Sequence, residues 1–178
     1  MVQRIASDRP RGAPAPLPGP SGEVFTDVAL LPMVRVGGYV SFDLSPFDGL
    51  PPLEGAEAGA RLRLAPPVLP VPWRTWLIVG LGFERAYEPS HLSTSPEAPA
   101  PGLLPVRAPV AGAWGGVLDV PIAVALGFRA NRVLEPFVEL GARLGVAFGG
   151  PLYAPASSPY LGRDVVALSL SLGVNSNQ

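Results

Sequence analysis

Residues 118–129, LDVPIAVALGFR, have a large apolar side chain at every even position and small residues, proline or charges at the odd ones. A β-strand turns successive side chains to opposite faces, so this stretch is typical of a strand with one apolar face. The same alternation recurs at 34–44, 61–64, 73–85, 135–148 and 166–174, and more weakly at 24–30. The sequence therefore predicts an all-β fold with six clear strands and a weaker seventh.

The composition bounds the function classes. The chain has 178 residues, a formal charge of -1 and no cysteine. This charge gives no reason to expect nucleic-acid binding, and the absence of cysteine excludes disulfides, thiolate metal sites and a cysteine nucleophile. No apolar run reaches the roughly 18 residues of a spanning helix. Residues 1–22, rich in Pro, Ala, Gly and Arg, are expected to be a disordered tail or loop before a domain at 23–178.

The connections between the predicted strands alternate in length. Long segments at 45–57, 87–114 and 149–161 are separated by short turns at 67–72 and 130–134. Outer-membrane barrels have this pattern, with long extracellular loops and short periplasmic turns. We therefore expect an antiparallel up-and-down transmembrane β-barrel of about eight strands, in which residues 34–44 run outward.

The strand count bears on the N-terminus. Small bacterial barrels have even numbers of strands, from eight upward. If residues 24–30 form a strand, the count is seven and one strand upstream would be missing. Loss of an upstream segment would account for that strand and for the apolar signal core that residues 1–20 lack.

We expect the apolar face to contact lipid and the mixed face to line a narrow lumen. An eight-stranded barrel has room inside only for small side chains with a few larger ones, and the mixed face is rich in Gly, Ala and Ser. The alternative is a soluble β-barrel or sandwich that encloses a small apolar ligand. The charged residues predicted to line the lumen are Arg35, Asp43, Arg61, Arg63, Arg74, Glu84, Asp119, Arg129, Glu139 and Arg143. The aromatic residues expected at the membrane interface are Trp73, Trp76, Tyr87 and Trp114.

The hairpin GGVLDVPIAVALGFRANRVLEPFVELGARLGVAFGG, residues 115–150, carries a family resemblance. Over about residues 33–175 the chain resembles small Gram-negative outer-membrane β-barrels of the OmpA/OmpX type, including uncharacterised proteins of GC-rich proteobacteria. The resemblance implies an outer-membrane location, the lipid bilayer as partner, and extracellular contacts through loops 45–57, 87–114 and 149–161. It implies a structural or interaction role or a narrow small-solute pore, without catalysis, metal or cofactor.

One pattern would point to an enzyme instead. His91, the only histidine, lies in PSHLSTSPE near Ser93, Ser95 and Glu97. This spacing resembles that of outer-membrane lipid A deacylases, in which His, Ser and a carboxylate perform acyl transfer. In those enzymes the pair lies on a barrel strand, whereas a proline-rich loop predicts a solvated histidine.

Overall fold

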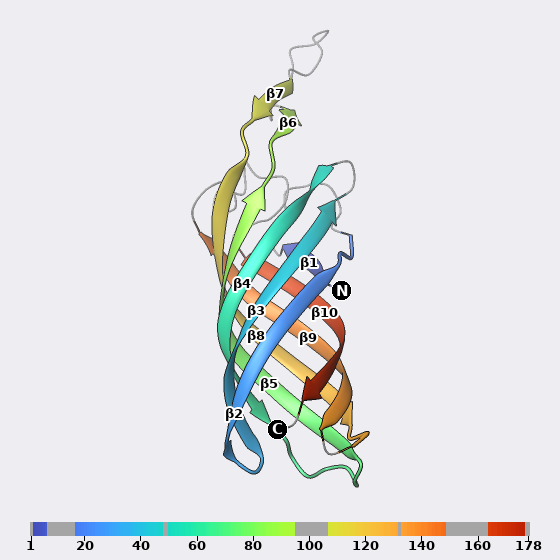
Figure 1. Cartoon of the computed structure of the whole chain (residues 1–178). Coiled ribbons are helices and arrows are strands. Elements are labelled where there is room, and N and C mark those ends of the chain that lie inside the picture. The colour runs from blue at the N-terminus through green and yellow to red at the C-terminus, as the bar shows by residue number, and fades with distance from the viewer. Residues whose placement is uncertain are drawn as a thin grey trace.

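Seven long antiparallel strands curl into one sheet in the computed structural model, which describes residues 2–6, 17–47, 50–94, 107–131, 133–148 and 164–176 (Figure 1). The described residues form no helix. The long strands are β2 (Ser21–Leu31), β3 (Val34–Phe47), β4 (Leu50–Leu64), β5 (Trp73–Glu88), β8 (Ala113–Phe128), β9 (Leu134–Phe148) and β10 (Asp164–Ser176). The predicted all-β fold is confirmed.

The seven long strands follow one another in the sheet in chain order. The order is β1-β10-β9-β8-β5-β4-β3-β2, where β1 (Val2–Ala6) is a short strand on the free edge of β10. Two short strands, β6 (His91–Thr94) and β7 (Arg107–Val110), form a separate hairpin. That hairpin, the end of β3 and the start of β4 lie at the upper end of the sheet in Figure 1, and the β2–β3 turn lies at the lower end.

The two faces of the sheet differ as the alternation predicts. On β8, Val120, Ile122 and Val124 lie on the outer surface, while Asp119 and Ala123 are buried in the interior of the curled sheet, the lumen. The other long strands repeat this division, so Leu, Val and Phe side chains coat the outside and the buried charges lie inside. The apolar ladders therefore do not meet in a common core.

The segment predicted as a loop at 45–57 is in fact a strand hairpin. β3 continues to Phe47 and β4 begins at Leu50, with register from Val34↔Leu64 to Phe47↔Leu50. The outward positions of β4 here are Pro52, Glu54 and Ala56, so no alternation of large apolar residues marks the strand. Backbone pairing on both sides holds it nonetheless.

The predicted loop at 87–114 is also shorter than expected. β5 and β8 pair as far as Tyr87↔Trp114 and Glu88↔Ala113, and the β6–β7 hairpin follows. Main-chain hydrogen bonds, which need no side-chain pattern, extend the strands through this proline-rich sequence. Residues 95–106 and the predicted loop at 149–161 lie outside the described residues.

The expected tail at 1–22 contains ordered backbone. Val2–Ala6 is β1, and β2 begins at Ser21. Before β2, the Leu17 amide donates to the Pro46 carbonyl at 2.9 Å, and the Leu44 amide donates to the Pro20 carbonyl at 3.0 Å. The edges of neighbouring strands supply these partners, which composition alone does not reveal.

Candidate functional site: the polar lumen

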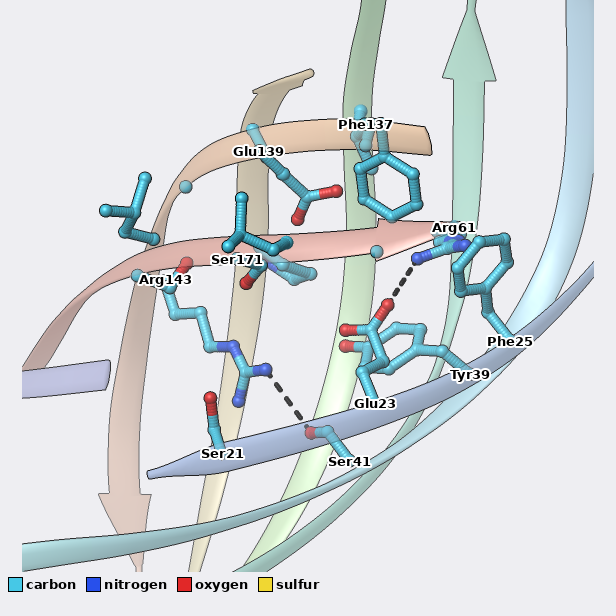
Figure 2. Close-up of a pocket in the computed structure, with 18 of the residues that line it drawn as sticks. Ser21, Glu23, Phe25, Tyr39, Ser41, Arg61, Phe137, Glu139, Arg143 and Ser171 are labelled. Carbon is cyan, nitrogen blue, oxygen red and sulfur yellow. Dashed lines mark hydrogen bonds and ion pairs between the residues drawn. The ribbon is translucent and has the colours of Figure 1, made fainter. Parts of the chain in front are cut away.

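A cavity of about 600 Å³ lies in the lumen between β2, β9 and β10. Figure 2 shows its polar side chains pointing inward from several strands. They include Glu23, Tyr39, Arg61, Glu139, Arg143 and Ser171. The volume is within the range of small-molecule sites, which is about 300 to 1,000 Å³.

Glu57 is the centre of a network on one side of this cavity. The Tyr39 hydroxyl donates to Oε1 of Glu57, and the Ser41 hydroxyl lies 3.3 Å from Oε2. Arg143 forms an ion pair with the same Oε2, and its Nη2 donates to the Ser41 Oγ at 3.3 Å. Because Glu57 is fully buried, these partners offset the cost of holding a carboxylate away from water.

A second network joins β2, β4 and β10 across the lumen. Arg61 Nη1 lies 2.5 Å from Glu23 Oε1, and Arg63 Nη1 lies 2.7 Å from Asp27 Oδ2. Arg63 Nη1 also donates to Asn175 Oδ1 at 3.3 Å. Arg63 therefore connects the two strands at opposite edges of the long-strand sheet through the interior.

Glu135 contacts three polar side chains near the lower end of the lumen. Trp76 Nε1 donates to its Oε1 at 2.9 Å, and Asn175 Nδ2 donates to the same atom at 3.2 Å. Arg74 Nη1 lies 3.6 Å from Oε2. The Arg63 guanidinium lies 4.5 Å from the centre of the Trp76 ring, a cation–π distance.

Apolar side chains fill the lumen toward both ends. The upper cluster consists of Leu53, Ala86, Val117, Ala147 and Val165. The lower cluster consists of Ala65, Trp76, Ile78, Ala123, Ala125 and Phe137, with Phe25 packed against it. The networks around Glu57 and Arg63 and the cavity lie between these two clusters, while the Glu135 network adjoins the lower cluster. Side chains thus occupy the lumen toward both ends, which suits a packed interior better than a wide channel.

Most of the predicted lumen charges lie inside. Asp43, Arg61, Arg63, Glu84 and Asp119 are buried, and Arg35, Arg74, Glu139 and Arg143 are partly buried with interior partners or neighbours. Arg129 differs, because β8 ends at Phe128 and Arg129 lies exposed in the following turn. Its amide donates to the Pro72 carbonyl at 3.0 Å, which fixes it at the lower rim.

The four predicted interface aromatics differ in exposure, and Tyr87 is half-buried. Trp73 and Trp114 are exposed near opposite ends of the sheet, where Trp73 packs on Phe128 and Trp114 on Tyr87, with ring centres 5.1 and 5.0 Å apart. Trp76 is buried in the lumen, contrary to the prediction. Three residues after an outward Trp73, a strand residue must face inward, so the period of two contradicts an interface position for Trp76.

Several residues of the networks were not among the predicted lumen charges. Glu57 lies in the segment expected to be a loop, and Glu23 and Asp27 lie in or beside the weakest predicted strand. Their odd positions match the inward parity of the paired strands, which is the signal that identifies them once the strands are known.

The described residues contain no group of three or more metal-ligating side chains that could hold a metal ion. The backbone of His91 lies in β6, outside the large sheet.

In the described part of the chain, no helix has the length and apolar character needed to span a bilayer.

Comparisons with protein-family models, with curated proteins and with solved structures found no match.

Proposed function

We propose that this protein is a small outer-membrane β-barrel of the OmpA/OmpX type with a structural or interaction role. The observation that carries the proposal is the division of faces. Leu, Val and Phe side chains coat the outside of every long strand except part of β4, while buried charges lie within. A soluble monomer rarely exposes an apolar surface of more than a few hundred Å², whereas a bilayer would cover this one.

The positions of the aromatic residues support the same proposal. Trp73 and Phe128 pack together near the lower end, and Phe83 and Phe148 pack near the upper end with ring centres 5.8 Å apart. At roughly 3.3 Å per residue, β5 rises about 33 Å from Trp73 to Phe83. A tilt near 40° reduces this to about 25 Å, the height of the apolar band between the aromatic girdles of outer-membrane barrels.

The filled lumen favours a structural or interaction role over solute transport. Salt bridges and the two apolar clusters occupy the interior on either side of the cavity. A narrow small-solute pore is the nearest variant, since charged and polar side chains line part of the cavity and only side chains at each end would need to rearrange.

The two other functions have less support. A soluble barrel for an apolar ligand needs an apolar interior, but Glu57, Arg63 and Glu84 are fully buried inside this one. An acyl hydrolase needs a fixed pair of histidine and serine on the barrel wall, and the backbone of His91 lies in the separate β6–β7 hairpin.

Fractionation of expressing cells tests the proposal. We expect the protein in the membrane fraction, extracted by detergent but not by salt or alkaline carbonate. Unheated samples should migrate differently from boiled samples on a denaturing gel, because the folded β-sheet of an outer-membrane protein resists the detergent until it is heated. A protein that stays monomeric in buffer without detergent would overturn the proposal.

A further inference from the structure

The long-strand sheet has two free edges that run in the same direction. β2 is antiparallel to β3, and successive antiparallel pairs lead through β4, β5, β8 and β9 to β10. With seven such strands, β2 and β10 are parallel to each other, and no backbone pairing joins them among the described residues. An antiparallel barrel closes with an even number, so one strand of opposite direction would restore the antiparallel pattern at both edges.

β1 already begins such a strand. It pairs antiparallel with β10 from Val2↔Ser169 to Ala6↔Val165. Farther along β10, over Ser171–Ser176, no described strand pairs with this side. The gap between that stretch and the free edge of β2, the seam, is thus continuous with an existing strand interface.

Two side chains at the seam are the most exposed large apolar residues of the described strands. Leu172 on β10 is 82% exposed and Val24 on β2 is 78% exposed, against 66% for Leu140 on the inner strand β9. The unpaired main-chain groups of two sheet edges add to this exposed apolar surface. Both features would be satisfied by one additional strand.

The lumen beside the seam also has an unused charge. Glu139 pairs in register with Ser171 and points into the cavity, whose wall includes Ser171 and Gly173 of the β10 edge and Glu23 of the β2 edge (Figure 2). Arg61, Arg63 and Arg143 influence Glu139 electrostatically, but no described side chain donates a hydrogen bond to its carboxylate.

We propose that the seam binds one extended polypeptide strand that continues the line and direction of β1, pairing with β10 over Ser171–Ser176 and with β2 on its other side. Residues opposite Leu172 and Val174 would be apolar and face outward. Residues opposite Gly173 and Asn175 would be small or polar and face the lumen. This proposal goes beyond the proposed function and does not require membrane insertion, because sheet edges and the cavity supply the contacts.

The strand would carry a basic residue opposite Ser171. Neighbouring strands lie about 4.8 Å apart, so this position is about 10 Å from the Glu139 backbone across β10. Arginine and glutamate side chains together span that distance and would form a charge-assisted hydrogen bond in the cavity. Main-chain pairing would give affinity, and the alternating side chains and this charge pair would give register.

Disulfide trapping tests the register, because the natural chain contains no cysteine. The probe is the capped peptide Val-Ser-Leu-Gly-Val-Arg, whose residues would lie opposite Ser176 through Ser171 in that order. With cysteine in its fifth position, it should cross-link to a Leu172→Cys protein in detergent micelles. With cysteine in its third position, it should cross-link instead to a Val174→Cys protein.

The matched control is Leu140→Cys, which is 66% exposed on the outer face but lies on β9, away from either edge. We expect at least about tenfold less cross-linking there. Equal yields at Leu140→Cys, yields that do not depend on register, or no peptide cross-link at either edge position would overturn the proposal. Protein-to-protein disulfides that outcompete the peptide would also overturn it, since a second copy would then occupy the seam.

Glu139→Gln tests the charge pair. The arginine peptide should bind the natural protein about fivefold more tightly than a peptide with glutamine at that position, as measured by fluorescence anisotropy. The difference should disappear in the Glu139→Gln protein, with the glutamine peptide binding both proteins alike. Equal affinities of the two peptides for the natural protein would overturn the requirement for a basic residue.

Discussion

Replacing Arg63 by methionine removes the cation that joins β2, β4 and β10 inside the sheet. Arg63 is 1% exposed, and its ion-pair partner Asp27 has a side chain that is 3% exposed. Methionine keeps the approximate length of the apolar stem but leaves the Asp27 carboxylate with only Arg61, whose Nε lies 3.4 Å away. The hydrogen bond to Asn175 and the contact with the Trp76 ring are lost as well.

Removing one partner of a buried ion pair costs about 3 to 5 kcal/mol. We expect a loss of about 3 kcal/mol in the free energy of unfolding, at the lower end because Arg61 still faces Asp27. The measurement is a urea titration of protein refolded into phosphatidylcholine vesicles, followed by tryptophan fluorescence. Arg129→Met is the matched control, since Arg129 is exposed, and it should change stability by no more than about 0.5 kcal/mol.

The double variant separates the ion pair from general damage. The loss of unfolding free energy in the double variant Asp27→Asn and Arg63→Met should be smaller than the sum of the two single losses by about 1 kcal/mol or more. The reason is that the double variant lacks both charges, so neither is left buried without the other. Strict additivity, or an Arg63→Met protein as stable as the Arg129→Met protein, would refute the role assigned to this network.

Three further predictions concern the outer face, the packing of the lumen and its closure. Ile122→Arg, at the middle of the outer face, should lower the free energy of unfolding in vesicles by about 2 to 4 kcal/mol. Leu44→Arg, near the upper end, should lower it by no more than about 1 kcal/mol. Equal losses for the two variants would argue against a bilayer around the sheet. Gly59→Ala would place a Cβ 2.6 Å from the Leu81 carbonyl oxygen, so urea unfolding should show a loss of about 1 to 3 kcal/mol, whereas Gly22→Ala meets nothing within 4 Å and should be neutral; neutrality at both sites would contradict the strand packing. In planar bilayers the natural protein should give no stepwise conductance. Trp76→Ala removes the largest fully buried side chain and should produce measurable conductance steps. Open channels in the natural protein would favour the function as a small-solute pore.

The sequence predicts the strands whose outward positions hold large apolar residues. Residues 118–129 and 135–148 correspond to β8 and β9 within a few residues, because alternation of Val, Leu and Phe with small residues specifies both strand and face. In β4 only residues 61–64 show this alternation, because the outward positions from Pro52 to Ala60 hold proline, glutamate and alanine and give no periodic apolar signal. Its pairing partners, not its own side chains, determine that it is a strand.

Contacts between side chains in the lumen are also only partly predictable from the sequence. Parity places Arg61 and Arg63 inside, but the partners Glu23, Asp27 and Asn175 come from distant strands whose register no local pattern fixes. The position of Trp76 follows from parity with Trp73, while residue type alone suggests an interface. Sequence therefore predicts which side chains face inward more readily than which of them meet.

Spin labels on β8 test most directly whether hydrocarbon surrounds the sheet. Single variants Ile122→Cys and Val124→Cys, labelled with a nitroxide in vesicles, should be relaxed strongly by oxygen and weakly by a water-soluble nickel chelate, because oxygen concentrates in the bilayer. Arg129→Cys, in the turn beyond β8, should show the opposite preference. If the nickel chelate relaxed the labels at Ile122 and Val124 as strongly as the label at Arg129, the outer face would contact water and the proposed membrane location would be wrong.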